Sequence, residues 1–113
     1  MAGTAGEFMK LLDAIVGGDF LKPATRVAAF SNQVGSFLTG RRAGEQFGYL
    51  GAVITDAKAA GWPKDGLIRW GGIWGNNWVV DPATGQNLVA YTNTMWEGSD
   101  GRFRDDLRDA VFS

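Results

Sequence analysis

Hydrophobic positions are densest between residues 69 and 94, where two apolar runs flank a turn sequence. The runs, residues 78–80 and 88–92, are rich in residues that fit a pleated, packed surface. Between them, Asp81-Pro82-Ala83-Thr84-Gly85 has proline at the second turn position and glycine where a left-handed residue closes the turn. The pattern predicts a central β-hairpin. Because both arms are apolar on both faces, each face is expected to be covered.

The clearest helix signal lies near the N-terminus. Thr4 and Glu7 have the spacing of a capping box, in which each side chain accepts a hydrogen bond from the other residue's backbone amide. An apolar stripe at helical spacing follows, formed by Phe8, Leu11, Leu12, Ile15 and Val16. Gly17-Gly18 then ends the predicted helix, because glycine readily forms a left-handed cap.

Two further helices are predicted. Pro23 fits the first turn of a short helix that runs to about Phe30, with Val27, Ala28 and Phe30 as its buried candidates. Ser99 or Asp100 caps a last helix. Its expected apolar face is Phe103, Leu107, Ala110 and Val111, and its expected solvent face is Arg104, Asp105, Arg108 and Asp109.

The order of these elements predicts the fold class. A buried strand is expected from Gln46 to Thr55, and residues 67–70 lead into the central hairpin. Strands grouped together between flanking helices are typical of an α+β fold, with helices laid on an antiparallel sheet. We therefore predict one domain over residues 1–113. It would hold a helical part in 1–45, an antiparallel sheet of three to four strands in 46–94 and a C-terminal helix in 99–112.

Composition narrows the possible functions. The 113 residues contain no cysteine and no histidine, which excludes disulfides, a cysteine nucleophile and a Ser-His-Asp triad. We expect no metal site and no cofactor. A net charge of −1 without a basic stripe argues against nucleic acid as a partner. No apolar run approaches the roughly 20 residues that cross a bilayer, and residues 1–4 do not resemble a signal peptide. No membrane partner and a cytoplasmic location are therefore expected, or else the chain is a piece of something larger.

Several segments taken together resemble a known family. They are residues 47–49, Trp70-Gly71-Gly72, residues 78–85 and residues 89–94. These segments are similar to the C-terminal part of the serine β-lactamase-like superfamily, which contains class C β-lactamases, penicillin-binding proteins and family VIII carboxylesterases. Residues 4–12 also resemble the helix that precedes the last strands in that family. The resemblance covers nearly the whole chain and implies the fold of that part of the enzymes.

The resemblance also implies a site. Enzymes of this family transfer acyl groups through a Ser-x-x-Lys box, a Tyr-x-Asn box and a third, pocket-lining strand of the Lys-Thr-Gly type. Trp70-Gly71-Gly72 matches the Trp-x-Gly form of the third box found in the esterase branch. The backbone amide of Ile73 would then be one donor of an oxyanion hole. Glycines on an edge strand would let a substrate approach the backbone closely.

The other two boxes have no counterpart here. None of the serines is followed three residues later by lysine, and Tyr91-Thr92-Asn93 has the letters of the second box but lies after the third, inside a predicted strand. We interpret Tyr91 and Asn93 as ordinary strand residues. Two hypotheses follow: a partial serine esterase that acts on small acyl esters or β-lactam-like ligands but cannot acylate itself, or a non-catalytic binding module with the same fold.

Aromatic residues provide further candidates. Trp70, Trp74 and Trp78 recur every four residues, which on a strand places them on one face. They form either an aromatic wall for a ligand or part of the core. We favour the core for Trp74 and Trp78 and leave Trp70 open, while Trp70, Gly71, Gly72 and Trp74 are our candidate substrate-binding residues.

The last strand suggests a partner. By the resemblance, residues 86–94 would lie beside a strand that this chain does not contain, which leaves an apolar and uncharged edge. We therefore predict a homodimer, with Val89 and Tyr91 at its interface, or association with a complementing N-terminal part.

Overall fold

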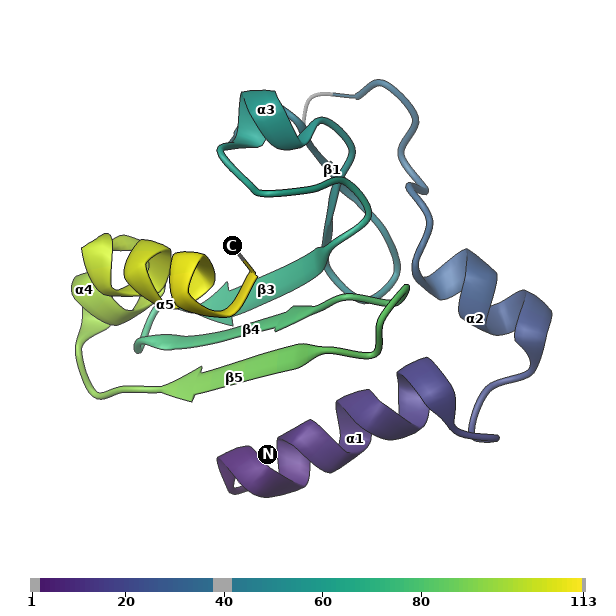
Figure 1. The fold of residues 1–113 in the computed structure, drawn as a ribbon, viewed down its shortest axis with the longest axis horizontal. Helices are drawn as coiled ribbons and strands as arrows, with labels where there is room; N and C mark the ends of the chain where they lie inside the picture. The colour runs from purple at the N-terminus through teal and green to yellow at the C-terminus, as the bar shows by residue number, and fades with distance from the viewer. Residues whose placement is uncertain (1–2, 38–41, 113) are drawn as a thin grey trace.

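The computed structural model describes residues 3–37 and 42–112, which form five helices and five strands (Figure 1). In chain order these are α1 (Ala5–Gly17), α2 (Pro23–Ala29), β1 (Glu45–Phe47), β2 (Ala52–Ile54), α3 (Ala57–Ala60), β3 (Ile68–Gly72), β4 (Asn76–Val80), β5 (Asn87–Tyr91), α4 (Met95–Asp100) and α5 (Arg102–Phe112). The fold is α+β, as predicted.

The five strands form one antiparallel sheet in the order β1-β2-β3-β4-β5, so strands that are consecutive in the chain lie side by side. The predicted turn joins β4 to β5. In it, the amide of Asp81 donates to the carbonyl of Gln86 at 2.8 Å, and the amide of Gly85 donates to the carbonyl of Asp81 at 2.8 Å. Gly85 has a φ of 76°, the left-handed conformation expected of it.

The sheet contains five strands rather than three or four, because the segment expected as one strand from Gln46 to Thr55 is a hairpin. Strands β1 and β2 pair with each other, with Gln46 opposite Val53. The turn between them is closed by a bond of 2.9 Å from the amide of Gly48 to the carbonyl of Gly51. A Cβ atom on Gly51 would lie 2.6 Å from the carbonyl oxygen of Arg69. Glycine therefore marks a turn pressed against β3, and not the interior of a strand.

Helix α1 begins at the predicted capping box. The amide of Glu7 donates to Thr4 Oγ1 at 3.2 Å, and the amide of Thr4 donates to Glu7 Oε2 at 2.9 Å. The helix packs along β5 (Figure 1). The ring of Phe8 meets that of Trp78 edge-on, with ring centroids 6.1 Å apart. Of the described helices, none is both long and apolar enough to cross a bilayer.

Helix α5 packs on the other face of the sheet. Its Phe112 belongs to the buried core cluster, whose other members are Ile54, Trp62, Leu67 and Val79. Because neighbouring residues of a strand point to opposite faces, Val79 faces α5 while Trp78 faces α1. The central strand β4 is thus covered on both sides, as the apolar pattern of the hairpin predicted.

Two predicted helix faces are wrong. In α2, Val27 is exposed, and Ala29 is the buried residue. In α5, Arg104 is buried, and Arg108 is also turned toward the molecule with its guanidinium 5.5 Å from the ring centre of Trp62. Trp62 offers Arg108 an aromatic surface, and Arg104 is paired with Asp100 and Asp105; a pattern based on hydrophobicity alone registers neither. The expected helix over 99–112 is also divided at Gly101 into α4 and α5.

Candidate functional site

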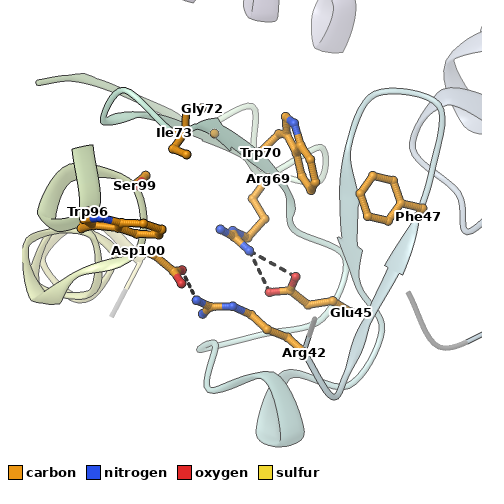
Figure 2. Close-up of a pocket in the computed structure, with 11 residues that line it drawn as sticks. Arg42, Glu45, Phe47, Arg69, Trp70, Gly72, Ile73, Trp96, Ser99 and Asp100 are labelled. Carbon is orange, nitrogen blue, oxygen red and sulfur yellow. Dashed lines mark hydrogen bonds and ion pairs between the residues drawn. The ribbon is translucent and has the colours of Figure 1, made fainter. Parts of the chain in front are cut away.

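A cavity of about 400 Å³ lies between the end of β3, strand β1 and helix α4 (Figure 2). Its lining residues are Arg42, Glu45, Phe47, Arg69, Trp70, Gly71, Gly72, Ile73, Trp96, Ser99 and Asp100. The structure therefore brings Trp70, Gly71, Gly72 and Ile73, which come from the sequence prediction, around one space. Trp74 does not line it.

Trp70-Gly71-Gly72, the candidate third box, lies where the pairing of β3 with β2 ends. Strand β3 is the third of five and not an edge strand as a whole. Its pairing with β2, however, covers Ile68 and Arg69 and stops there, while its pairing with β4 continues to Gly72. The backbone of residues 70–72 is thus paired with a strand on one side only. The expected edge exists locally, because β2 is only three residues long.

The two glycines of the box have a structural reason within the chain. A Cβ atom on Gly71 would lie 2.7 Å from both the carbonyl oxygen of Asn76 and Oδ1 of Asn77, and one on Gly72 would collide with Oδ1 of Asn76. Asn77 is buried, and its amide nitrogen donates to the carbonyl of Gly98 in α4. Glycine at these positions therefore leaves room for both asparagines, and Asn77 holds α4 beside the cavity.

Ile73 begins the tight turn between β3 and β4, which the amide of Gly75 closes on the carbonyl of Gly72 at 3.0 Å. Within residues 3–37 and 42–112, no hydrogen bond uses the backbone amide of Ile73. The residue is exposed and lines the cavity. The chain thus presents an available donor at the position that the resemblance gives to an oxyanion hole.

Trp70 is neither a core residue nor free in solvent. It is 37% exposed, and its ring packs against that of Phe47 with centroids 4.8 Å apart and an interplanar angle of 76°. Figure 2 shows the two rings together on the β1 side of the cavity. Edge-on contact of this kind fixes both rings, so Trp70 forms a firm wall of the cavity.

The predicted alignment of three tryptophans on one face is wrong. Trp74 lies in the β3–β4 turn and is 75% exposed, so it is not a core residue either. Trp70 and Trp78 lie on neighbouring strands and are directly paired in the register. The period of four residues arises because the chain reverses between them. Trp78 is half-buried beneath Phe8.

A buried ion pair forms a polar wall of the cavity. Arg69 Nη1 donates to both oxygens of Glu45, at 2.9 Å and 3.1 Å, and both side chains are almost inaccessible to solvent. Burial lowers the pKa of Arg69, and repulsion from Arg104 and Arg42 adds to this, while attraction to Glu45 opposes it. The guanidinium also lies 5.7 Å from the ring centre of Trp62.

A second charged group closes the cavity on the α4 side. Asp100 accepts a hydrogen bond from Arg42, as Figure 2 shows. It also accepts one from Nη1 of Arg104 at 2.6 Å. Trp96, one turn before Asp100, exposes most of its ring beside them. Sequence reasoning missed these residues. The available signal was a charged residue, Arg69, inside an otherwise apolar strand, which requires a partner of opposite charge.

The remaining candidates lie away from the cavity. Val89 is half-buried and Tyr91 is 47% exposed; both belong to β5, which is the edge of the sheet among the described residues. Asn93 follows that strand and is exposed. None of the three lines the cavity.

Comparison with known proteins tests the resemblance. No family model matches the chain. The esterase EstB of Burkholderia gladioli is 40% identical over 115 aligned residues, which include the whole of this chain and 29% of EstB. The solved structure of EstCE1, a hydrolase with promiscuous acyltransferase activity, superimposes with a TM-score of 0.89 at 37% identity, over 98% of this chain and 30% of EstCE1.

The chain is homologous to the C-terminal part of β-lactamase-like esterases. This confirms the resemblance found in the sequence, and it confirms the α+β fold that the resemblance implied. The chain spans less than a third of the length of either relative. The rest of each relative has no counterpart among the residues of this chain.

Proposed function

We propose that the chain is a partial β-lactamase-like serine esterase that supplies the third, substrate-lining box of an acyl-ester hydrolase. The observation that carries this proposal is the free edge of β3 at Trp70-Gly71-Gly72, which faces a cavity and ends at the available amide of Ile73. In this role Ile73 donates a hydrogen bond to the oxyanion, and Trp70 and Phe47 form a wall beside the acyl group.

The chain is not expected to hydrolyse esters alone. Acyl transfer in this class needs a serine activated by a lysine, and the sequence has no Ser-x-x-Lys. A complementing polypeptide would bring the nucleophile to the open side of β3. The chain matches 29% of EstB, so the other 71% of EstB is a suitable partner for the test.

Complementation tests the proposal directly. Hydrolysis of 4-nitrophenyl butyrate is measured for the chain, for EstB lacking the matching part, and for the mixture. We expect activity in the mixture alone. Ile73→Pro removes the donor and should lower kcat about 100-fold, as loss of an oxyanion donor does. Ile73→Val keeps the amide and should retain activity. A mixture without activity, although both parts are folded and bound to each other, would refute the proposal.

The chain alone provides a second test. Treated with a serine-directed phosphonate, it should show no mass increase in intact-protein mass spectrometry. A stoichiometric adduct that maps to one serine would establish an independent enzyme and refute the partial-enzyme proposal.

The alternative is a non-catalytic binding module of the same fold. It is favoured by the way the chain itself holds the α4 side of the cavity, through the hydrogen bond that Asn77 donates to the carbonyl of Gly98. Saturable binding of a neutral butyrate ester to the chain, combined with no activity in any complemented mixture, would support this alternative.

A further inference from the structure

Arg69 has hydrogen-bonding capacity that the protein does not use. Its Nη1 atom makes both bonds to Glu45, and no other residue among 3–37 and 42–112 accepts a hydrogen bond from its Nε or Nη2 atoms. The residue is 8% exposed and lines the cavity. Neither atom is a buried group without a partner, so both Nε and Nη2 reach the solvent of the cavity, where a ligand could take the place of water.

The guanidinium is also fixed in place. Glu45 holds one nitrogen from the β1 side, and the ring of Trp62 lies 5.7 Å from the guanidinium carbon. In Figure 2 the group points into the space between β1 and α4, toward Arg42. A planar donor held in this way binds a carboxylate with little further loss of side-chain entropy.

The charged side chains around Arg69 already form ion pairs with one another, and Arg104 pairs with Asp105 as well as with Asp100. Burial lowers the pKa of Arg69, attraction to Glu45 opposes this, and repulsion from Arg104 and Arg42 adds to the lowering. The carboxylates nearby are already engaged, Glu45 by Arg69 and Asp100 by Arg42 and Arg104. A carboxylate from outside would therefore bind at nitrogens that no carboxylate of the described residues occupies, and it would replace solvent rather than an existing partner.

We propose that the cavity binds a carboxylate carried on the acyl part of the ester, and that Arg69 is the residue that holds it. The proposal rests on the proposed function, because it places the ester carbonyl at the amide of Ile73. The substrate class is then a monoester of a short dicarboxylic acid: the ester lies at the open end of β3, and the free acid lies at Arg69.

Binding to the chain itself tests the proposal without catalysis. The probes are the monomethyl esters of succinic, glutaric and adipic acids, each compared with its uncharged dimethyl ester. We expect at least one monoester to bind about ten to 100 times more tightly than its diester, the range for a hydrogen bond to a charged group. Nuclear magnetic resonance should show shifts at the Ile73 amide and the Arg69 Nε–H.

The variants separate the role of Arg69 from general stability. Arg69→Gln alone leaves Glu45 buried without a partner and is expected to unfold in part. The double variant Glu45→Gln/Arg69→Gln removes both charges, so it should fold and bind the monoester and the diester equally. Arg102→Gln is the matched control, since Arg102 is exposed and pairs with Asp106 at 3.5 Å. It should keep the wild-type preference.

Four results would overturn the proposal. The first three are equal binding of monoesters and diesters to the wild type, no binding of either, and a preference that persists in the double variant. A fourth is that the remainder of EstB shifts the Arg69 resonance and prevents monoester binding, which would mean that a carboxylate of the partner protein fills the site.

Failure of this proposal is distinguishable from failure of the proposed function. A complemented mixture that hydrolyses 4-nitrophenyl butyrate but shows no preference for charged esters would overturn the carboxylate site alone. Selective monoester binding by a chain that never supports hydrolysis would overturn the esterase function alone.

Discussion

The two halves of β3 have opposite environments although they are continuous in one strand of five residues. Ile68 is fully buried, paired to β2 on one side and to β4 on the other. Trp70, Gly71 and Gly72 are paired to β4 alone and line the cavity. The closed half belongs to the core, whereas the open half forms the candidate site.

This difference shows that the length of a neighbouring strand, here β2, can determine where a ligand site forms on a sheet. Strand β2 ends its pairing at Arg69, where the turn at Gly51 crosses against the backbone. Beyond that point the main chain of β3 is available to a ligand. Arg69 lies at the boundary and carries the buried charge pair that separates core from cavity.

The largest expected effect comes from breaking that boundary. Glu45→Gln leaves the charge of Arg69 buried without its carboxylate, which should cost about 3 kcal/mol of unfolding free energy or more. Asp106→Asn is the control, because Asp106 and its partner Arg102 are both exposed; it should change stability by about 0.5 kcal/mol or less. Urea unfolding measures both. Equal changes would show that the buried pair does not stabilise this boundary.

Substitution of Ile68 and of Ile73 compares the closed half of β3 directly with the turn that follows its open half. Ile68→Ala removes buried methyl groups and leaves a cavity, so we expect a loss of about 3 kcal/mol. Ile73→Ala, in the exposed turn, should stay within about 0.5 kcal/mol of the wild type. Thermal unfolding is the measurement. A comparable loss at Ile73 would mean that the turn is packed more tightly than the structure shows.

Substitution of Gly71 tests whether the open half of β3 tolerates a side chain. Gly71→Ala places a methyl group 2.7 Å from the carbonyl oxygen of Asn76, which should shift the hairpin and cost about 2 kcal/mol. Gly17→Ala, at the end of α1 with no atom within 4 Å of the added carbon, should be neutral or slightly stabilising. Melting temperatures of the two variants give the answer, and a neutral Gly71→Ala would contradict the close approach.

A fall in pH should lower the stability of the closed half of β3 through Asp81. This residue directly follows Val80 of β4, which is paired with Ile68. Burial raises the pKa of Asp81, but hydrogen bonds from Lys64, Thr84 and the amide of Ala83 outweigh it and lower that pKa. The carboxylate therefore stabilises the fold above its ordinary pKa of about 3.9, and this contribution is lost as pH falls through the lowered value.

Asp81→Asn should remove this pH dependence. We expect the variant to be about 1–2 kcal/mol less stable than the wild type near pH 7, with the difference shrinking below about pH 4. Urea unfolding across that range measures it. A constant difference from pH 7 down to pH 2 would contradict the role given to the carboxylate.

The smallest effect concerns the other open edge, at β5. This strand is the edge of the sheet among the described residues, and we expect it to support self-association. Tyr91→Lys should weaken the dimer; Tyr91 is a better position than Val89, because Val89 is partly covered. Tyr49→Lys, in the exposed β1–β2 turn, is the control. Light scattering that shows a wild-type monomer at micromolar concentration would rule out the dimer.

Local signals in the sequence determined much of this protein. The capping box of Thr4 and Glu7, the turn from Asp81 to Gly85 and the α+β order depend on neighbours a few residues apart, so the sequence predicts them. The Trp70-Gly71-Gly72 box was also visible, through a family resemblance. The single long strand over 46–55 was wrong, because glycine inside an apolar run signals either a strand or a turn.

Only the tertiary structure decided what surrounds the box. Glu45 and Arg69 are 24 residues apart, and Arg42 and Asp100 are 58 apart, so no local pattern joins them. Likewise, Trp62 lies near Arg69 of β3 and Arg108 of α5, and so offers an aromatic surface to arginines from two different elements. Burial of a charge depends on which partner the fold brings within hydrogen-bonding distance, and that distance is fixed by the packing of the whole chain.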